Sequence, residues 1–350
     1  MAYTEIDDPS AYFQKVLYTG NGQARALTFD GNSDLQPDWV WIKDRDNVRD
    51  HQLFDSVRGV GKILLSNSTA AEGDDNNRLS AFNSNGFSVG TNTTVNDNSQ
   101  KYVAWNWKAG TSFTNDASST GIGTIDSTGS ANDTAGFSIC SYTGTGSNGT
   151  VKHGLNSAPK MIIVKSLGAS ESWFVYHADL TSATYTINLD TTGAQFSNAS
   201  TWNSTAPSSS VFSIGTDAGT NGSSVNFIAY CFAEKQGYSK FGSYTGNGNA
   251  DGTFAYTGFK PAWLMVRRTD GANSWIIMDN KRTTFNPMGE ELKAEDTGTG
   301  NVATRWDQLS NGFKLRNAGA AVNASGGTYI YMCFAENPFT SSTGTPVTAR

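Results

Sequence analysis

Two pairs of tryptophans are the residues of this sequence best suited to binding a ligand. Trp39 and Trp41 stand two positions apart, as do Trp105 and Trp107, so each pair would project from one face of a β-strand. Such a row of indole rings could form a platform that stacks on sugar rings. Some matching positions elsewhere in the chain hold aliphatic side chains, which a hydrophobic core accepts and a stacking platform does not. They are Met161, Ile163, Met265 and Met332. Core packing is therefore the favoured interpretation, and carbohydrate binding is the alternative.

Two acidic loops carry the oxygen ligands that calcium prefers. They are "DGNSD", Asp30 to Asp34, and "EGDDNN", Glu72 to Asn77. Oxygen atoms at alternate positions suit Ca²⁺, but neither loop follows the twelve-residue pattern that closes on a bidentate glutamate. We therefore interpret both loops as solvated turns and predict no metal ligand.

The sequence lacks the usual catalytic constellations. It has no GxSxG motif and no cysteine paired with a landmark histidine, and its histidines lack metal-binding spacing. These histidines are His51, His153 and His177. A charged run could hide the carboxylate pair of a glycosidase, although a solvated face is the favoured interpretation. Its members are Glu290, Glu291, Glu295 and Asp296. We predict a non-enzymatic protein with no catalytic and no cofactor-binding residue.

Composition narrows the class of protein further. Charged residues make up 16% of the 350 residues, aromatic residues make up 12%, and the net charge is −6 without a run of basic residues. This balance disfavours nucleic-acid and anionic-membrane binding. Cys140, Cys231 and Cys333 lie within apolar runs, where a thiol is expected to be a small buried hydrophobe. The sequence shows neither a signal-peptide pattern nor a long apolar stretch, so a soluble chain made in the cytosol is expected.

A repeated pentapeptide indicates how the chain is organised. "YTGNG" begins at Tyr18 and Tyr244, and "YTGTG" begins at Tyr142. Three further landmarks follow each copy in the same order: a proline-led strand ending in Lys or Arg, a phenylalanine-centred strand and an aromatic closing strand. The proline-led strands are Pro37 to Lys43, Pro159 to Lys165 and Pro261 to Arg267. Each landmark set predicts one structural unit.

The spacing of these landmarks predicts three homologous modules. Trp107 ends the first closing strand 89 residues after Tyr18, and Phe232 and Phe334 end the others 90 residues after Tyr142 and Tyr244. The predicted modules, called repeats 1, 2 and 3, span 10–110, 136–236 and 237–339. Residues 1–9 would be an N-terminal segment, 111–135 a Gly/Ser/Thr/Asn-rich linker or strand-bearing excursion, and 340–350 an extended tail. Repeats 2 and 3 should pack closely, while repeat 1 would hang more freely.

Short alternating strands separated by polar turns predict an all-β fold. We expect three β-sandwich modules in tandem, of jelly-roll or immunoglobulin-like topology. Each "YTGxG" would form the first hairpin of its sandwich. The strongest helical signals are "DPSAY", Asp8 to Tyr12, and "NPMGEELKAED", Asn286 to Asp296, where a capping residue precedes proline.

Several stretches resemble the repeat modules of virion structural proteins of tailed bacteriophages, particularly marine phages. They are "IDDPSAYFQKVLYTGNG", "TAGFSICSYTGTGSNGTVKHGLNSAPKMIIVK", "GFKPAWLMVRRTDG" and "CFAENPFTSSTGTPVTAR". The resemblance covers nearly the whole chain, and "HGL…APKMIIVK" is its most specific part. Such proteins are generally described as tail-fibre-like or uncharacterised virion components. The resemblance implies a place in a virion and supplies no catalytic or ligand residues.

Modular architecture, polar loops and the phage-like stretches together predict a tail fibre or a tail-associated adhesin that faces the host surface. A head-decoration or head-fibre protein on the capsid is the first alternative, and a carbohydrate-binding or carbohydrate-active protein is the second. Expected partners are other virion proteins and a host cell-surface glycan or protein, without nucleic acid or membrane insertion. A fibre would favour a homotrimer, although three modules of one chain could instead form a pseudo-symmetric monomer. The expected location is the virion.

Overall fold

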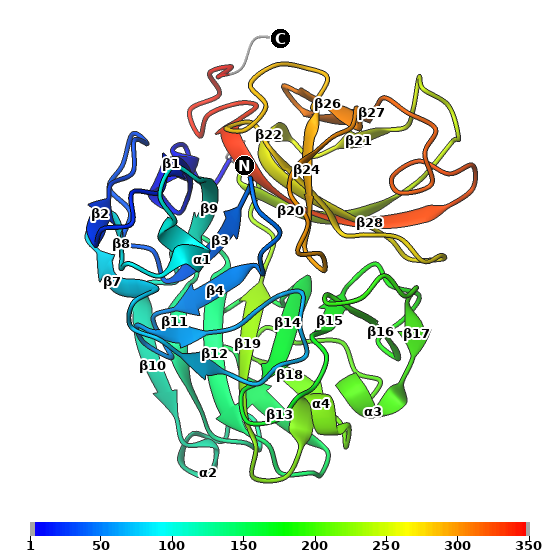
Figure 1. Cartoon of the computed structure of the whole chain (residues 1–350). Helices are drawn as coiled ribbons and strands as arrows, with labels where there is room; N and C mark the ends of the chain where they lie inside the picture. Colours follow the sequence, from blue (N-terminus) through cyan, green and yellow to red (C-terminus); the bar gives the residue numbers. More distant parts are fainter. Residues whose placement is uncertain (1–3, 348–350) are drawn as a thin grey trace.

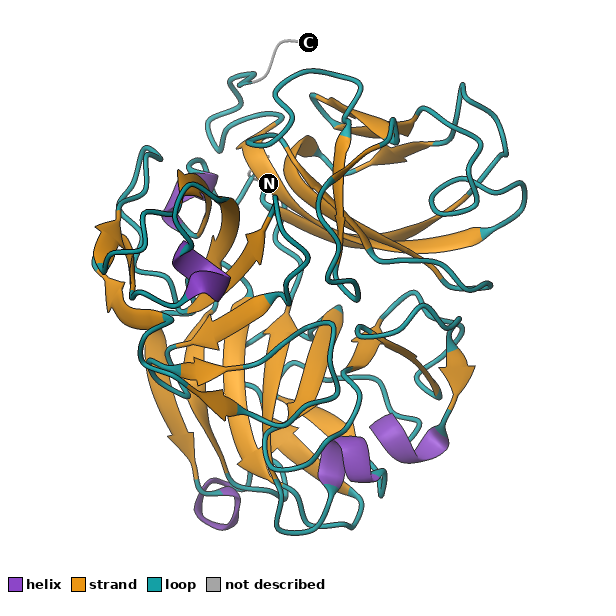
Figure 2. Ribbon diagram, viewed as in Figure 1, coloured by secondary structure: helices purple, strands orange, loops and turns teal. Residues whose placement is uncertain are grey.

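The computed structural model describes residues 4–347, and nearly all of its regular structure is β-strand (Figure 2). The predicted all-β class is confirmed. The helices are single turns, each begun by a capping Asp or Asn side chain that accepts a backbone N–H. They are η1 (Pro9–Ala11), α1 (Thr93–Asn96), α2 (Ala117–Thr120), α3 (Ala199–Trp202) and α4 (Ala218–Asn221).

Repeat 1 contains one larger and two smaller antiparallel sheets. The larger sheet has the order β1 (Phe13–Thr19), β9 (Lys101–Trp107), β3 (Trp39–Asp44) and β4 (Gln52–Asp55). A second sheet has the order β2 (Arg25–Leu27), β8 (Gly86–Val89) and β7 (Leu79–Asn83). The third pairs β5 (Lys62–Ile63) with β6 (Gly73–Asp74).

In repeat 2 the larger sheet also takes in the preceding segment. Its order is β10 (Thr111–Asn115), β11 (Ser127–Asn132), β12 (Phe137–Thr143), β19 (Asn226–Phe232), β14 (Met161–Ser166), β15 (Phe174–His177), β16 (Tyr185–Asn188) and β17 (Phe196–Ser197). A small sheet pairs β13 (Gly149–Lys152) with β18 (Val211–Ile214). Segment 111–135, predicted as a linker or strand-bearing excursion, therefore carries two strands of this sheet.

Repeat 3 has the longest strands. Its larger sheet has the order β20 (Ser239–Thr245), β28 (Thr328–Pro338), β22 (Phe259–Arg268), β23 (Ile276–Asp279), β24 (Glu290–Lys293) and β25 (Asn301–Val302). The smaller sheet has the order β21 (Phe254–Tyr256), β27 (Gly312–Leu315) and β26 (Trp306–Leu309). The larger sheets of all three repeats thus share one order: "YTG" strand, closing strand, proline-led strand, next strand.

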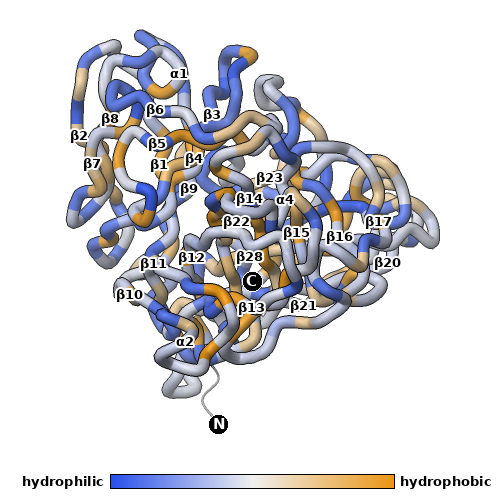
Figure 3. The backbone as a smooth tube through the Cα atoms, turned by 90° about the horizontal axis from the view of Figure 1, so that it is seen from below, coloured by the Kyte–Doolittle hydropathy of each residue, from blue (hydrophilic) through white to orange (hydrophobic). Residues whose placement is uncertain are grey.

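The larger sheets are buried on both faces. In β3, Val40 and Ile42 face a core within repeat 1, whereas Trp39 and Trp41 face a core shared by all three repeats. The corresponding strands β14 and β22 divide their side chains in the same way between a local core and the shared core. In Figure 1 the three coloured lobes surround this centre, and in Figure 3 hydrophobic stretches gather near β14 and β22. The expectation that repeat 1 hangs freely is wrong.

Polar contacts at matching positions close the three repeats into a ring. Asp55, His177 and Asp279 each pair in register with the first core residue of the neighbouring proline-led strand. Asp55 Oδ2 accepts a hydrogen bond from Tyr230 of repeat 2 at 2.7 Å, and His177 Nε2 lies 3.2 Å from the carbonyl of Tyr331 in repeat 3. Asp279 Oδ2 accepts from Trp105 Nε1 of repeat 1 at 3.0 Å. Each repeat therefore contacts the next through an equivalent position.

The "YTGxG" stretch crosses between two sheets, so its prediction as a hairpin is wrong. Each copy joins the larger sheet to the smaller sheet, because β1 and β2, β12 and β13, and β20 and β21 are unpaired with each other. In repeat 2 the Tyr142 hydroxyl donates to the Thr220 carbonyl at 2.6 Å, and buried Asn221 accepts from Thr145 N at 2.7 Å. Repeats 1 and 3 repeat both contacts. The motif recurs because it clamps each loop against its own repeat.

Gly144, the glycine of this clamp in repeat 2, should not tolerate a side chain. A Cβ at Gly144 would lie 2.3 Å from the carbonyl oxygen of Gly222, which is backbone and cannot rotate away. We expect Gly144→Ala to lower the free energy of unfolding by about 1–3 kcal/mol, measured by urea denaturation. Gly168→Ala is the matched control, since its Cβ would meet only Val225 Cγ1 at 3.6 Å. Equal effects of the two substitutions would contradict the clamp.

The two predicted helices had different outcomes. Asp8 caps η1 as expected, and its carboxylate accepts from Ser10 N at 3.0 Å. The helix predicted over Asn286 to Asp296 is wrong, because Glu290–Lys293 form β24 between β23 and β25. Sheet pairing overrides the local signal there. In the predicted tail, Ser342 N donates to Asp7 Oδ1 at 2.7 Å, and the ends of both predicted terminal segments lie outside the described residues.

Candidate functional site

The paired tryptophans are core residues, as the favoured interpretation predicted. Trp39, Trp41, Trp105 and Trp107 are each at most 1% exposed. The Trp39 ring lies 4.6 Å from that of Trp107 and 4.5 Å from that of Tyr230, so it joins repeats 1 and 2. The three cysteines are also buried and unpaired, and burial raises the pKa of Cys140 to about 12. None of these rings or thiols is available to a ligand at the surface.

The acidic loops use their carboxylates in ion pairs. Asp30 lies 2.6 Å from Lys281 Nζ, and Glu72 lies 3.2 Å from Arg58 Nη1. Asp74 lies 2.6 Å from Lys62 Nζ. Among residues 4–347, no three His, Cys, Asp or Glu side chains come together as a metal site. The second loop contains β6 and is therefore not a simple turn, and Asp30, Glu72 and Asp74 each face a nearby cation.

The three histidines are separate, buried and structural. His51 Nδ1 accepts from Trp41 Nε1 at 2.7 Å, and His153 Nδ1 accepts from Leu155 N at 3.2 Å. Burial lowers the pKa values of His153 and His177 to about 4 and holds that of His51 well below its ordinary value. Neutral imidazoles thus accept local backbone N–H groups at His153 and His177 and an indole N–H at His51.

The carboxylates between 290 and 296 are held in ion pairs and hydrogen bonds within the protein. Glu290 lies 2.7 Å from Arg45, and Glu291 lies 2.6 Å from Arg305. Glu295 accepts a hydrogen bond from Trp275 N at 3.0 Å, and burial raises the pKa of its carboxyl. Adjacent residues of β24 point to opposite faces, so Glu290 and Glu291 diverge. The run is partly an interface, because Arg45 belongs to repeat 1.

The cations that end the proline-led strands are buried between repeats. Lys43, Lys165 and Arg267 are all 0% exposed. Lys43 Nζ donates to the Thr297 carbonyl of repeat 3 at 3.0 Å, and Lys165 Nζ donates to the Thr69 carbonyl of repeat 1 at 2.7 Å. Arg267 donates to the Gly193 carbonyl of repeat 2. These three buried cations form a second ring of contacts between repeats.

Lys165 should make stability depend on pH. Burial lowers its pKa from 10.5 to about 8, so the unfolded chain holds more protons between those values. The free energy of unfolding must then rise with pH in that window. Relative to Lys165→Met, the free energy of unfolding of the wild-type protein should rise by up to about 1.4 kcal/mol per pH unit, measured by urea unfolding. Lys101→Met, at an exposed lysine, provides the baseline, and a pH-independent difference for Lys165→Met would refute the account.

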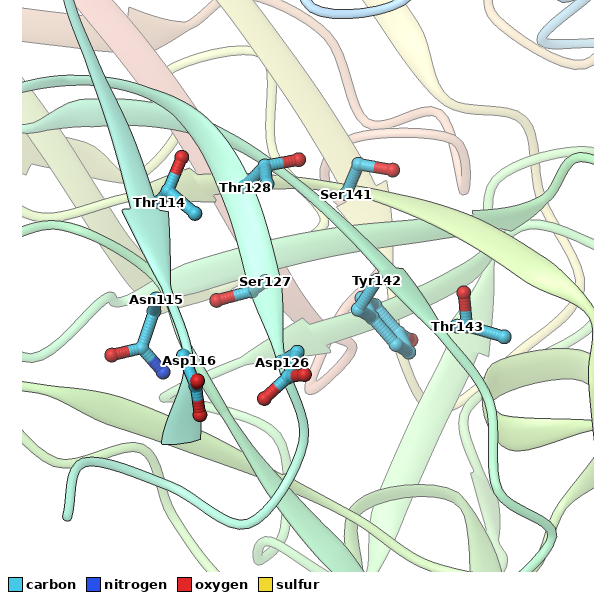
Figure 4. A pocket seen from close by; sticks show the side chains of 9 residues that line it. All are labelled: Thr114, Asn115, Asp116, Asp126, Ser127, Thr128, Ser141, Tyr142 and Thr143. Atoms are coloured by element: carbon cyan, nitrogen blue, oxygen red, sulfur yellow. The ribbon is translucent and has the colours of Figure 1, made fainter. Parts of the chain in front are cut away.

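A first surface pocket, of about 340 Å³, lies beside the β10–β12 edge (Figure 4). Both carboxylates and the tyrosine hydroxyl of its lining have partners within the protein. Asp116 caps α2 by accepting from Ser119 N at 3.1 Å, Asp126 accepts from Ala117 N at 2.8 Å, and Tyr142 belongs to the clamp. The charged groups of this pocket therefore serve the fold of segment 111–135.

A second pocket, of about 700 Å³, lies in repeat 3 and is the candidate site. Buried Met288 lies among its apolar lining residues, and the Phe285 side chain, 81% exposed, also lines it. Lys260 Nζ and Glu336 Oε2 form an ion pair at 2.6 Å within the lining. Gln308 also lines the pocket, and its Nε2 has no hydrogen-bond partner among the described residues. The pocket will be called the 285 pocket.

The 285 pocket arises from a longer connection in repeat 3. The strand after the proline-led strand pairs with the next segment through Leu53 and Leu64, Val175 and Ile187, and Ile277 and Leu292. These partners are 11, 12 and 15 residues apart. The extra residues place Phe285 and Asn286 beside β26, where Asn286 Oδ1 accepts from Gln308 N at 2.9 Å. The sequence did not predict this pocket, because Asn286 followed by Pro287 is a typical helix start.

The fold defines an all-β protein whose three repeats share an aromatic-rich core. The family model DUF7483, described as a domain of unknown function, matches residues 8–338, and the chain belongs to this family. Comparison with curated proteins gives no match. Within the described part of the chain, no helix has the length and apolar character needed to cross a membrane.

Proposed function

We propose that the chain consists of three homologous β-sandwich modules. Each repeat pairs a larger and a smaller sheet around its own core, and the larger sheets share one strand order. Contacts at equivalent positions join the modules in a ring. The ring gives one chain a three-lobed form, so a homotrimer is not needed to produce pseudo-threefold symmetry.

We propose that the protein is a non-enzymatic structural protein of a phage virion, most simply a tail fibre or tail-associated adhesin. The observation that carries this proposal is the division between a buried core shared by the three repeats and the polar loops around it. A core that is shared by all three repeats suits a structural component of a particle. Exposed loops on such a scaffold suit recognition of a surface. The phage-like stretches of the sequence favour a virion protein.

A head-decoration or head-fibre protein is the second candidate. The pseudo-threefold ring favours it, because a three-lobed body can make quasi-equivalent contacts at a threefold position of a capsid lattice. Other virion proteins would be the partners in both cases. The candidates differ in where the protein sits and in whether its free face meets the host.

Immunogold labelling of intact particles tests the placement. Antibodies raised against the purified chain should label the tail of the phage that encodes it, and should compete with host cells for the particle. Label confined to the capsid would replace the adhesin by the head-decoration candidate. Particles without label, in preparations where denatured virions contain the chain, would contradict an exposed role.

A further inference from the structure

We propose that the 285 pocket binds a neutral sugar unit. This inference rests on the proposed adhesin function and gives it a site, because a host-surface glycan would be the ligand. The pocket volume of about 700 Å³ lies in the range of small-molecule sites. Its lining combines an aromatic ring, aliphatic side chains, amides, hydroxyl groups and one ion pair, as recognition of an amphipathic ligand requires.

Phe285 supplies the apolar contact. Its side chain is 81% exposed, whereas the phenylalanines of the local cores are almost fully buried. Water contact with a whole aromatic ring is unfavourable, and a ligand with an apolar face would relieve it. The C–H face of a pyranose ring is such a face, while its edge carries hydroxyl groups for the polar part of the lining.

Gln308 supplies a hydrogen-bond donor that the protein itself does not use. The residue is 4% exposed, it lines the pocket, and its Nε2 has no partner among residues 4–347. A buried amide N–H without a partner costs free energy, so natural proteins rarely leave one. A sugar hydroxyl oxygen in the pocket would accept this hydrogen bond.

The charge of the lining favours a neutral ligand over an ionic one. Lys260 and Glu336 are the charged residues of the lining, and they pair with each other at 2.6 Å. Their net charge is zero, so neither a phosphate nor an ammonium group finds a free counter-charge. A hydroxyl group can both donate to the carboxylate and accept from the ammonium. An apolar ligand would leave the Gln308 amide without a partner.

Saturation-transfer NMR of the purified full chain with glucose, galactose, mannose and N-acetylglucosamine tests the proposal. At least one of these sugars should receive saturation from the protein. Phe285→Ala and Gln308→Met should each weaken its binding by about tenfold or more. Phe196→Ala is the matched control, because Phe196 is a partly exposed phenylalanine of repeat 2 outside both pockets. Thermal unfolding of each variant verifies that the fold is retained.

The proposal is overturned if none of the four sugars binds, or if folded Phe285→Ala and Gln308→Met bind as the wild type does. Equal loss in Phe196→Ala would also overturn it, because binding would then not depend on this pocket. The outcome for the sugar site can be distinguished from the outcome for the proposed function. Tail labelling without sugar binding leaves the adhesin placement and removes the sugar site, whereas sugar binding with capsid labelling does the reverse.

Discussion

Asp279→Ala should lower the free energy of unfolding by about 3–5 kcal/mol. Asp279 and Arg282 are 0% exposed in their side chains and pair at 2.6 Å. Burial alone would raise the pKa of Asp279, but the charge and hydrogen bonds of Arg282 hold it below its ordinary value. Alanine would leave the Arg282 guanidinium buried without its counter-ion and Trp105 Nε1 without its acceptor across the boundary with repeat 1.

Asp30→Ala is the matched control for this prediction. Asp30 also joins repeat 1 to repeat 3, through Lys281 at 2.6 Å, but both side chains are solvent-exposed in part. A surface ion pair contributes less than about 1 kcal/mol, so this variant should unfold close to the wild type in urea. If Asp279→Ala were as mild as Asp30→Ala, the boundary between repeats 1 and 3 would not depend on the buried pair.

The spacing of landmarks in the sequence predicted the strands of the larger sheets, because corresponding strands stand at nearly equal intervals in the three repeats. Tyr18, Tyr142 and Tyr244 each stand one residue before the end of a "YTG" strand, and each hydroxyl donates to a carbonyl 77 or 78 residues later. The prediction that the glycines of "YTGxG" form a hairpin turn was wrong. Short polar turns predict hairpins locally, whereas the partner of Gly144 is backbone at Gly222, far along the chain.

The shared core could not be predicted from substitution patterns alone. Replacement of Trp39 by Met161 at the matching position showed that the position is buried, but not which core it enters. The signal was present in the neighbouring residues: Val40 and Ile42 are apolar too, and a strand without alternation is buried on both faces. One face needs a local core, and the other needs a further sheet. That second requirement rules out a freely hanging repeat 1.

The 285 pocket was missed for a different reason. Phe285 and Gln308 are 23 residues apart, and β24 and β25 intervene, so only the fold brings them together. A local reading of Asn286 and Pro287 as a helix start concealed the loop. The available signal was the departure from the repeat, since repeat 3 alone lengthens this connection. Residues added to one of three similar repeats have no counterpart in the strand packing that the repeats share.

Trp39→Ala should also lower the free energy of unfolding by about 3–5 kcal/mol. The Trp39 side chain is 1% exposed and stacks at 4.5 Å on Tyr230 of repeat 2, so alanine would open a cavity between repeats. Trp306→Ala provides the comparison, because Trp306 is 0% exposed but belongs to the core within repeat 3. Calorimetry and circular dichroism would measure both variants.

The decisive feature of this comparison is the shape of the unfolding transition. If the shared core holds the three repeats together strongly, a cavity in repeat 3 lowers the stability of the whole chain, and Trp306→Ala unfolds in one transition, like Trp39→Ala. If the repeats are only loosely joined, Trp306→Ala unfolds repeat 3 first and leaves a second transition near that of the wild type. The ring of Asp55, His177 and Asp279 contacts, together with the shared core, leads us to expect one transition for both variants.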